Sequence, residues 1–240
     1  LSRWFFTAHR RFHSTRKGIK MNTITTDTPR IYVSCLAAYN NGTLHGAWID
    51  ADQDADEIRA EVAEILKTSP NPNVILRDLV CDCGHEWTEQ ISSPNYSNVC
   101  PECDGKGNDD KPDYKSAEEW AIHDTDNFHG IKVEEWESFE KVAELAEILA
   151  EHGEAFAAFW NNSGSGDDVK KEDFEDAYRG RFVTFKEFAE ELSDDMGDET
   201  KAHYFDYGGI DGFVNDLEHG GDYWTAPANP YGVHVFDNNA

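Results

Sequence analysis

Apolar residues first gather in two runs of strand-like composition. Residues 31–39 (IYVSCLAAY) form the first run and residues 43–50 (TLHGAWID) form the second. Residues 40–42 (NNG) lie between them, and both Asn and Gly tolerate a positive φ angle. Two such runs around an Asn-Gly step predict a β-hairpin.

Helical spacing of apolar residues begins directly behind this hairpin. Asp54 can cap the start of a helix, with Glu57 as the acidic third position. The apolar residues that follow are spaced i, i+4, i+7 and i+8 and therefore share one helical face: Ile58, Val62, Ile65 and Leu66. Residues 69–72 (SPNP) end the helix, so residues 30–72 are predicted to form a small α+β domain.

The rest of the chain divides into an insert and a mainly helical half. Residues 73–115 are punctuated by Cys, Gly and Pro and have little helical period, so they are predicted to be an insert. Residues 119–125 (EWAIHDT) are a strand candidate. The next helix is predicted from Ser138 to His152 and stops at Gly153, and its apolar side consists of Phe139, Val142, Ala143, Ala146 and Leu149.

Shorter elements are predicted towards the C-terminus. Thr184 and Glu187 form a candidate capping box at the start of one helix. The predicted helices are 154–161, 171–178, 185–193 and 209–218, the predicted strands are 222–225 and 232–236, and residues 161–168 are a predicted loop. Residues 116–180 are thus expected to be a central, mainly helical domain, and residues 181–240 a C-terminal domain of helices and short antiparallel strands. The predicted fold class is an elongated α+β protein of several small domains with an inserted, zinc-ribbon-like segment.

Charge changes this picture more than any single motif does. Residues 31–240 contain 47 Asp or Glu against 14 Lys or Arg, a formal net charge of −33. Self-repulsion opposes compaction, so a folded chain with this charge needs a reason for it. Double-stranded DNA carries one charge per ~1.7 Å of axis, so 33 charges along one face would match roughly 55 Å of duplex. The acidity disfavours direct binding to nucleic acid or to an anionic membrane and favours a basic groove as partner.

Acidic residues are concentrated in short runs, most of them at helical spacing. Each run alone is typical of a solvated helix face, but together they have few compensating lysines. They do not fit the oxygen-ligand pattern of a calcium loop, whereas hydration of a halophilic protein stays open as an alternative. The candidate DNA-mimic surface consists of Asp124, Asp126, Glu134, Glu135, Glu137, Asp167, Asp168, Glu172, Asp173, Glu175, Asp176, Glu187, Glu190, Glu191, Asp194, Asp195, Asp198 and Glu199.

Four of the five cysteines are candidate metal ligands. Sixteen residues separate Cys81 and Cys83 from the knuckle Cys100-Pro-Glu-Cys103, counted from Cys83. Two thiol pairs at this separation predict a structural zinc (Zn²⁺) site, and four protein ligands leave no open position for catalysis. The first pair is Cys-x-Cys, so His85 is an alternative ligand. A redox pair and free cysteines also remain alternatives, and Cys35 is predicted to be a buried apolar residue.

Two further features of the chain have little influence on the fold prediction. Leu1 to Lys20 contain six Lys or Arg and no acidic residue, so residues 1–29 are predicted to be a basic leader that is disordered or non-native, with a basic arm or a targeting segment as alternatives. His123-Asp124 and the pair His203 and Asp206 could act as acid/base groups, but no nucleophile elbow, P-loop or HExxH motif accompanies them. The chain is therefore not expected to be an enzyme.

Several blocks of sequence resemble the ArdA antirestriction proteins. The first block comprises residues 30–34 (RIYVS), 39–42 (YNNG) and 46–48 (GAW), and the second is 118–124 (EEWAIHD) with Phe128. The third comprises residues 204–206 (YFD), 222–225 (DYWT) and 232–236 (GVHVF). The resemblance covers about residues 29–72 and 116–238, and the insert at 77–114 departs from the family's minimal form.

This resemblance implies an elongated, usually homodimeric protein that mimics bent B-DNA. Such a protein occupies the DNA groove in the methyltransferase core of type I restriction–modification enzymes. It is encoded on a plasmid, phage or conjugative element and acts in the bacterial cytoplasm. A rival hypothesis from another class is a zinc-ribbon adaptor whose acidic body keeps it in solution.

Overall fold

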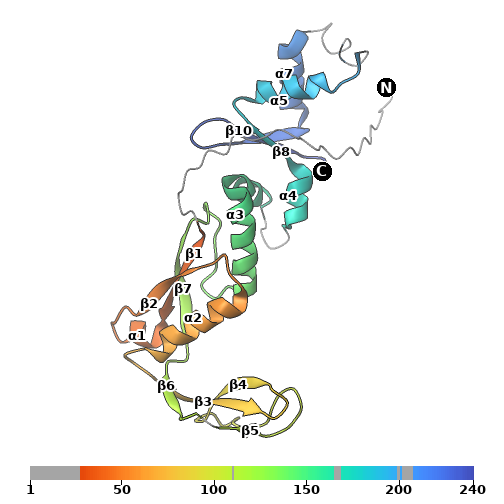
Figure 1. Ribbon diagram of the computed structural model, residues 1–240. Helices are drawn as coiled ribbons and strands as arrows, with labels where there is room; N and C mark the ends of the chain where they lie inside the picture. The colour runs from red at the N-terminus through yellow and green to blue at the C-terminus, as the bar shows by residue number, and fades with distance from the viewer. Residues whose placement is uncertain (1–27, 110, 165–168, 199–200, 202–207) are drawn as a thin grey trace.

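The computed structural model describes residues 28–109, 111–164, 169–198, 201 and 208–240. The molecule is elongated, with three small antiparallel sheets following one another along its length (Figure 1). The insert forms one end, the N-terminal sheet with two longer helices forms the middle, and the C-terminal sheet with shorter helices forms the other end. The predicted elongated α+β class is confirmed.

The N-terminal sheet is built from segments far apart in the sequence. Its order is β2-β1-β7, with β1 (Arg30–Cys35) in the centre, β2 (Gly46–Asp50) on one side and β7 (Trp120–Asp126) on the other. Both pairings are antiparallel. The first strand of the predicted central domain thus completes the sheet of the predicted N-terminal domain.

The predicted tight hairpin is wrong in its turn, although the two runs do pair. The second half of the first run forms a short helix, α1 (Leu36–Asn40), and β2 begins only at Gly46. Asn41 N–H bonds to the carbonyl oxygen of Ala38, and Gly42 follows with a φ of 78°. A helix C-terminus and a hairpin turn both favour Asn-Gly because both need positive φ, so the same signal here ends a helix.

Two helices cover the core face of this sheet. α2 (Ala55–Lys67) buries Ile58, Val62 and Leu66 of the predicted face. α3 (Phe139–Asn162) begins at Ser138, whose hydroxyl accepts a hydrogen bond from the Lys141 N–H group. Gly153 interrupts α3 with a φ of 53°, so the predicted stop and the second predicted helix behind it are both confirmed.

The insert is a sheet of its own, placed between α2 and β7. It consists of β3 (Val74–Cys81), β4 (Glu86–Gln90), β5 (Gly107–Asn108) and β6 (Tyr114–Ser116), with β3 paired to the other three. The described residues of the insert contain no helix, as the sequence predicted. The segments that enter and leave the insert lie side by side, and the N–H group of Ala117 bonds to the carbonyl oxygen of Leu66 at 3.0 Å.

The C-terminal part contains the predicted helices and one strand that the sequence did not predict. The helices are α4 (Lys171–Ala177), α5 (Phe185–Asp194) and α7 (Gly209–Gly220), and the strands are β8 (Tyr178–Phe182), β9 (Tyr223–Pro227) and β10 (Val233–Asp237). The sheet order is β8-β10-β9, so the two predicted strands pair as expected. β8 escaped prediction because its sequence, YRGRF, is short, polar and interrupted by glycine.

Aromatic side chains continue the core from the middle of the molecule into the C-terminal sheet. Phe174 of α4 is buried and lies within 6.3 Å, centroid to centroid, of rings on α3, β8 and β10. Trp224 of β9 stacks on Phe236 of β10 at 4.1 Å. These residues belong to the same core cluster as Ile31 and Val142, so a single apolar core links the two parts.

Replacement of Phe174 by alanine is predicted to lower the free energy of unfolding by about 3–5 kcal/mol, because it leaves a cavity where four elements meet. Urea denaturation followed by circular dichroism measures the change. Tyr231→Ala is the matched control, since this side chain is 72% exposed and its loss should change stability by less than about 0.5 kcal/mol. A loss of less than about 1 kcal/mol for Phe174→Ala would contradict a shared core.

Candidate acidic surface and cysteine cluster

A row of exposed carboxylates lies along α3. Glu140, Glu144, Glu147 and Glu151 are spaced i, i+4, i+7 and i+11 and are all exposed. With a rise of 1.5 Å per residue, the row is about 16 Å long. The sequence prediction omitted these four residues, although their helical spacing was the signal that could have found them.

The predicted carboxylates of α4 continue this row. Glu172, Asp173, Glu175 and Asp176 are all exposed, and the Asp173 carboxylate also accepts a hydrogen bond from the Lys170 N–H group. Lys171 bonds to Glu151 at 2.5 Å and therefore connects α4 to the end of the α3 row. That hydrogen bond lowers the pKa of the Glu151 carboxyl below its ordinary value.

The predicted carboxylates on α5 and behind it are also at the surface. Glu187, Glu190, Glu191, Asp194, Asp195 and Asp198 are exposed. Glu187 caps its helix, but its carboxylate accepts from the Val183 N–H group and not from that of Thr184, while the Thr184 hydroxyl accepts from Glu187 N–H as predicted. Asp194 forms an ion pair with Lys201 at 2.9 Å.

The acidic residues on and behind β7 are partly neutralised. Asp126 is half-buried and bonded to Arg30, whereas Asp124 is exposed. In the following loop, Glu134 and Glu135 are exposed and Glu137 is half-buried, with Lys132 beside Glu134 and Lys141 beside Glu137. This part of the predicted surface carries less uncompensated charge than the helices do.

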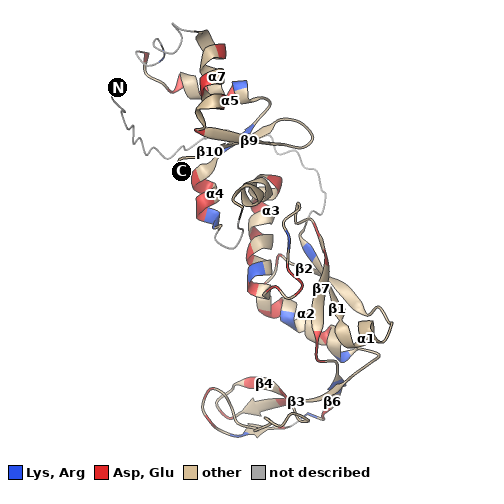
Figure 2. Cartoon of the chain, turned by 180° about the vertical axis from the view of Figure 1, so that it is seen from behind, with Lys and Arg blue, Asp and Glu red and all other residues tan. Residues whose placement is uncertain are grey.

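The carboxylates therefore recur along the length of the molecule instead of gathering at one spot. Figure 2 shows Asp and Glu on α3, α4, α5 and α7, with few Lys or Arg between them. Three residues of the candidate surface, Asp167, Asp168 and Glu199, lie outside the described residues, as do His203 and residues 204–206.

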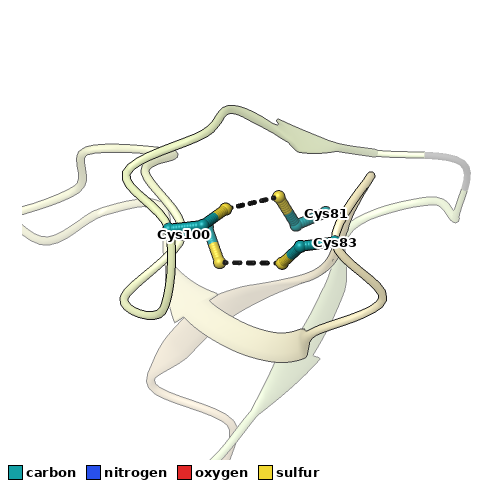
Figure 3. A group of neighbouring side chains, drawn as sticks. Cys81, Cys83 and Cys100 are labelled. Carbon is teal, nitrogen blue, oxygen red and sulfur yellow. Dashed lines mark hydrogen bonds between the residues drawn. The ribbon is translucent and has the colours of Figure 1, made fainter.

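The four cysteines of the insert come together as the spacing predicted. Cys81 is the last residue of β3 and Cys83 lies in the turn between β3 and β4, where the Gly84 N–H group bonds to the Cys81 carbonyl oxygen at 2.8 Å. Cys100 begins the second turn, where its N–H group bonds to the Gly105 carbonyl oxygen at 2.7 Å. In Figure 3 the side chains of Cys81 and Cys83 face Cys100 across the space between the two turns.

The four sulfur atoms fit a tetrahedral metal ion. They lie within 4.8 Å of one another, with 3.4 Å between Cys81 Sγ and Cys103 Sγ and 3.7 Å between Cys83 Sγ and Cys100 Sγ. A zinc–sulfur bond of 2.3 Å in tetrahedral geometry corresponds to a sulfur–sulfur distance of about 3.8 Å. The group is complete without His85, whose ring stacks on Trp87.

Without a cation the thiolates at this site are unfavourable. The Gly105 N–H group lowers the pKa of the Cys103 thiol. The neighbouring sulfurs of Cys81, Cys83 and Cys100, together with desolvation, outweigh this effect and raise the pKa to about 12. A side chain on Gly105 would place its Cβ 3.2 Å from Cys81 Sγ and 3.3 Å from Cys103 Sγ, so any larger residue there would have to push the sulfurs by a few tenths of an ångström. Cys35, the fifth cysteine, is buried in the N-terminal core and is not part of the group of four.

Within the residues that the structure describes, none of the helices is both long enough and apolar enough to cross a membrane.

Fold and surface together define an elongated, acidic α+β protein with a cluster of four thiols in an inserted sheet. A model of the antirestriction protein (ArdA) family matches residues 31–228. The chain therefore belongs to the ArdA antirestriction family, whose members are inhibitors that act on restriction–modification enzymes and not enzymes themselves. No curated protein matches the chain.

The cysteine cluster is predicted to bind one metal ion per chain and to release protons as it does so, because thiols with raised pKa must ionise to bind metal. Cobalt titration, read by its thiolate charge-transfer absorption, measures the stoichiometry. Cys103→Ser should abolish tight binding, whereas Cys35→Ser, which removes the fifth thiol, should leave it unchanged. Equal binding by both variants would contradict a four-thiol site.

Proposed function

We propose that this protein inhibits type I restriction–modification enzymes by mimicking DNA. The observation that supports the proposal is the recurrence of exposed carboxylates on rigid helices along an elongated body. Helices hold charges at fixed spacing, which is what a stand-in for regularly spaced phosphates requires. A cationic groove shaped for duplex DNA would meet the same sign and a similar density of charge.

Inhibition on this hypothesis is competition for the DNA-binding groove of the methyltransferase core. Long-range attraction between the acidic rows and basic side chains of the groove speeds encounter, and many weak pairs then add up across a large footprint. A single exposed pair contributes only ~0–1 kcal/mol. No individual carboxylate should therefore be essential.

A homodimer would extend the acidic track beyond the length of one chain. The C-terminal part is the proposed place for this contact, and the bacterial cytoplasm, after entry of DNA on a mobile element, is the proposed place of action. Both statements come from the family resemblance. The length argument supports the dimer, because a longer track would cover more of a DNA-sized groove.

The metal in the insert is proposed to be a structural zinc ion. Four thiolates with tetrahedral spacing are the donor set that zinc prefers, and they leave no position for a substrate. Cys81, Cys83, Cys100 and Cys103 would hold it and so connect the two turns of a sheet that has little apolar core.

The cysteine cluster also keeps a second candidate function open, a zinc-ribbon adaptor that recruits another protein. Mutation of the cysteines separates the two hypotheses. A DNA mimic should lose stability only in the insert and still inhibit, whereas an adaptor should lose its partner altogether.

The primary test is displacement of duplex DNA from a purified type I methyltransferase by this protein at low and moderate salt. Removal of four charges, in Glu144→Gln, Glu147→Gln, Glu172→Gln and Asp176→Asn combined, should weaken inhibition roughly tenfold or more at low salt, since several weak pairs are lost together. Each single change should alter inhibition by less than about fivefold.

A charge-preserving variant at the same four positions, with Glu→Asp and Asp→Glu, is the matched control and should inhibit like the unchanged protein. Distributed mimicry would be wrong if one carboxylate-to-amide change abolished inhibition in a folded protein. It would also be wrong if the four-charge variant inhibited normally.

A further inference from the structure

One face of the N-terminal sheet carries an exposed tryptophan beside a half-buried tyrosine. Ile31, Val33 and Ile49 point into the core beneath α2 and α3. Side chains alternate along a strand, so Tyr32 and Trp48, which lie opposite each other in the β1–β2 register, are on the other face. Their rings meet edge to face at 5.5 Å, and 42% of Trp48 is exposed.

Carboxylates flank these rings. Asp124 of β7 lies opposite Tyr32 in the register, and Asp50 ends β2 two residues behind Trp48; both are exposed. Tyr32, Trp48, Asp50 and Asp124 are called the aromatic face below. An exposed tryptophan beside carboxylates is the combination that binds a guanidinium group, by stacking on the ring and by charge.

An arginine of the protein itself already shows this mode of binding. The guanidinium carbon of Arg30 lies 5.4 Å from the centroid of the Trp48 ring, and the same group bonds to Asp126 at 2.5 Å. Arg30 occupies one side of the indole, while Asp50 and Asp124 stay exposed for another cation.

We infer that the aromatic face is an anchor point of the inhibitory interface and takes up arginine side chains from the DNA-binding surface of the inhibited enzyme. The inference rests on the proposed function and goes beyond it. A purely distributed mimic has no residue whose loss matters by itself, whereas a buried aromatic residue at the centre of an interface is the type that dominates binding.

The two kinds of contact affect different rate constants. Exposed carboxylates act at long range, so their removal slows association and reduces the salt dependence. A stacked arginine–tryptophan contact forms only after docking and becomes stronger as water is excluded, so its removal speeds dissociation. Kinetics of binding to the enzyme can therefore separate the anchor from the acidic rows.

The test uses a type I methyltransferase from which this protein displaces duplex DNA. Surface plasmon resonance at two salt concentrations measures how tightly the protein binds that enzyme. Trp48→Ala should raise Kd roughly 10- to 30-fold, as for an interface anchor, almost entirely through a faster dissociation rate. Trp48→Phe retains an aromatic ring, so its Kd should rise less than that of Trp48→Ala. Val99→Ala is the control, because this side chain is 40% exposed, much like Trp48, but lies in the insert, which contributes no residue to the candidate acidic surface.

Hydroxyl-radical footprinting of the unchanged protein provides a second measurement that needs no variant. Oxidation of Trp48 should fall in the complex, whereas oxidation of Trp87, a half-buried tryptophan of the insert, should not. Thermal melting of each variant excludes unfolding as the cause of weaker binding.

The inference is overturned if Trp48→Ala binds like the unchanged protein while the four-charge variant is weakened, a result that leaves DNA mimicry intact. It is equally overturned if Trp48→Ala and Val99→Ala change Kd to the same extent, or if Trp48 stays accessible in the complex. Failure of the unchanged protein to displace DNA from any type I methyltransferase would instead refute the proposed function, and the anchor with it.

Discussion

Self-repulsion among carboxylates is the constraint to which the rest of this structure responds. A net charge of −33 over residues 31–240 favours an expanded chain, and folded proteins have only a few kcal/mol of stability to spare. The main counterweight is the apolar core, which runs without a break from Ile31 in the first sheet, across α3, to Phe236 in the last strand. Rings packed edge to face and stacked, such as Trp224 on Phe236, add directional contacts to simple burial. The long shape spreads charges apart while this internal core keeps the parts connected.

Several of the cations lie where elements meet. Arg59 of α2 bonds to Glu140 of α3, Lys171 of α4 to Glu151 of α3, and Lys186 of α5 to Asp211 of α7. Arg179 and Asp237 connect β8 to β10 in the same way, and Arg77 and Asp113 connect two parts of the insert. Each exposed pair is weak by itself. Placed at joints, however, these pairs relieve repulsion between elements at a few carboxylates of the rows, such as Glu140 and Glu151. Asp and Glu still outnumber Lys and Arg on these helices (Figure 2), and this excess is what recognition by a basic groove requires.

Local signals predicted the parts of the fold that local physics determines. Ser138 and Gly153 bracket the first half of α3 because a capping hydroxyl and a positive φ act within one turn of the chain. The four thiols could be found from spacing alone, since two turns bring each pair together. The short helix α1 and the strand β8 could not be found, because an Asn-Gly step serves two kinds of turn and because β8 is a strand only through its pairing with β10. The aromatic face was invisible for the same reason: Tyr32, Trp48 and Asp124 meet only after three strands have paired.

The insert offsets the repulsion among its carboxylates by different chemistry. The insert includes exposed acidic residues such as Asp82, Glu86 and Glu102 but few buried apolar ones, chiefly Val74 and Leu79. The free energy gained by burial is roughly proportional to the apolar area that is buried. Such a small core therefore contributes little against the entropic cost of ordering the chain. Four thiols drawn together around a metal ion would replace that missing core by coordination, while the paired strands at its base fix the insert to α2 and β7. An acidic protein can thus be extended at one end without enlarging its apolar core, provided that the added segment carries its own crosslink.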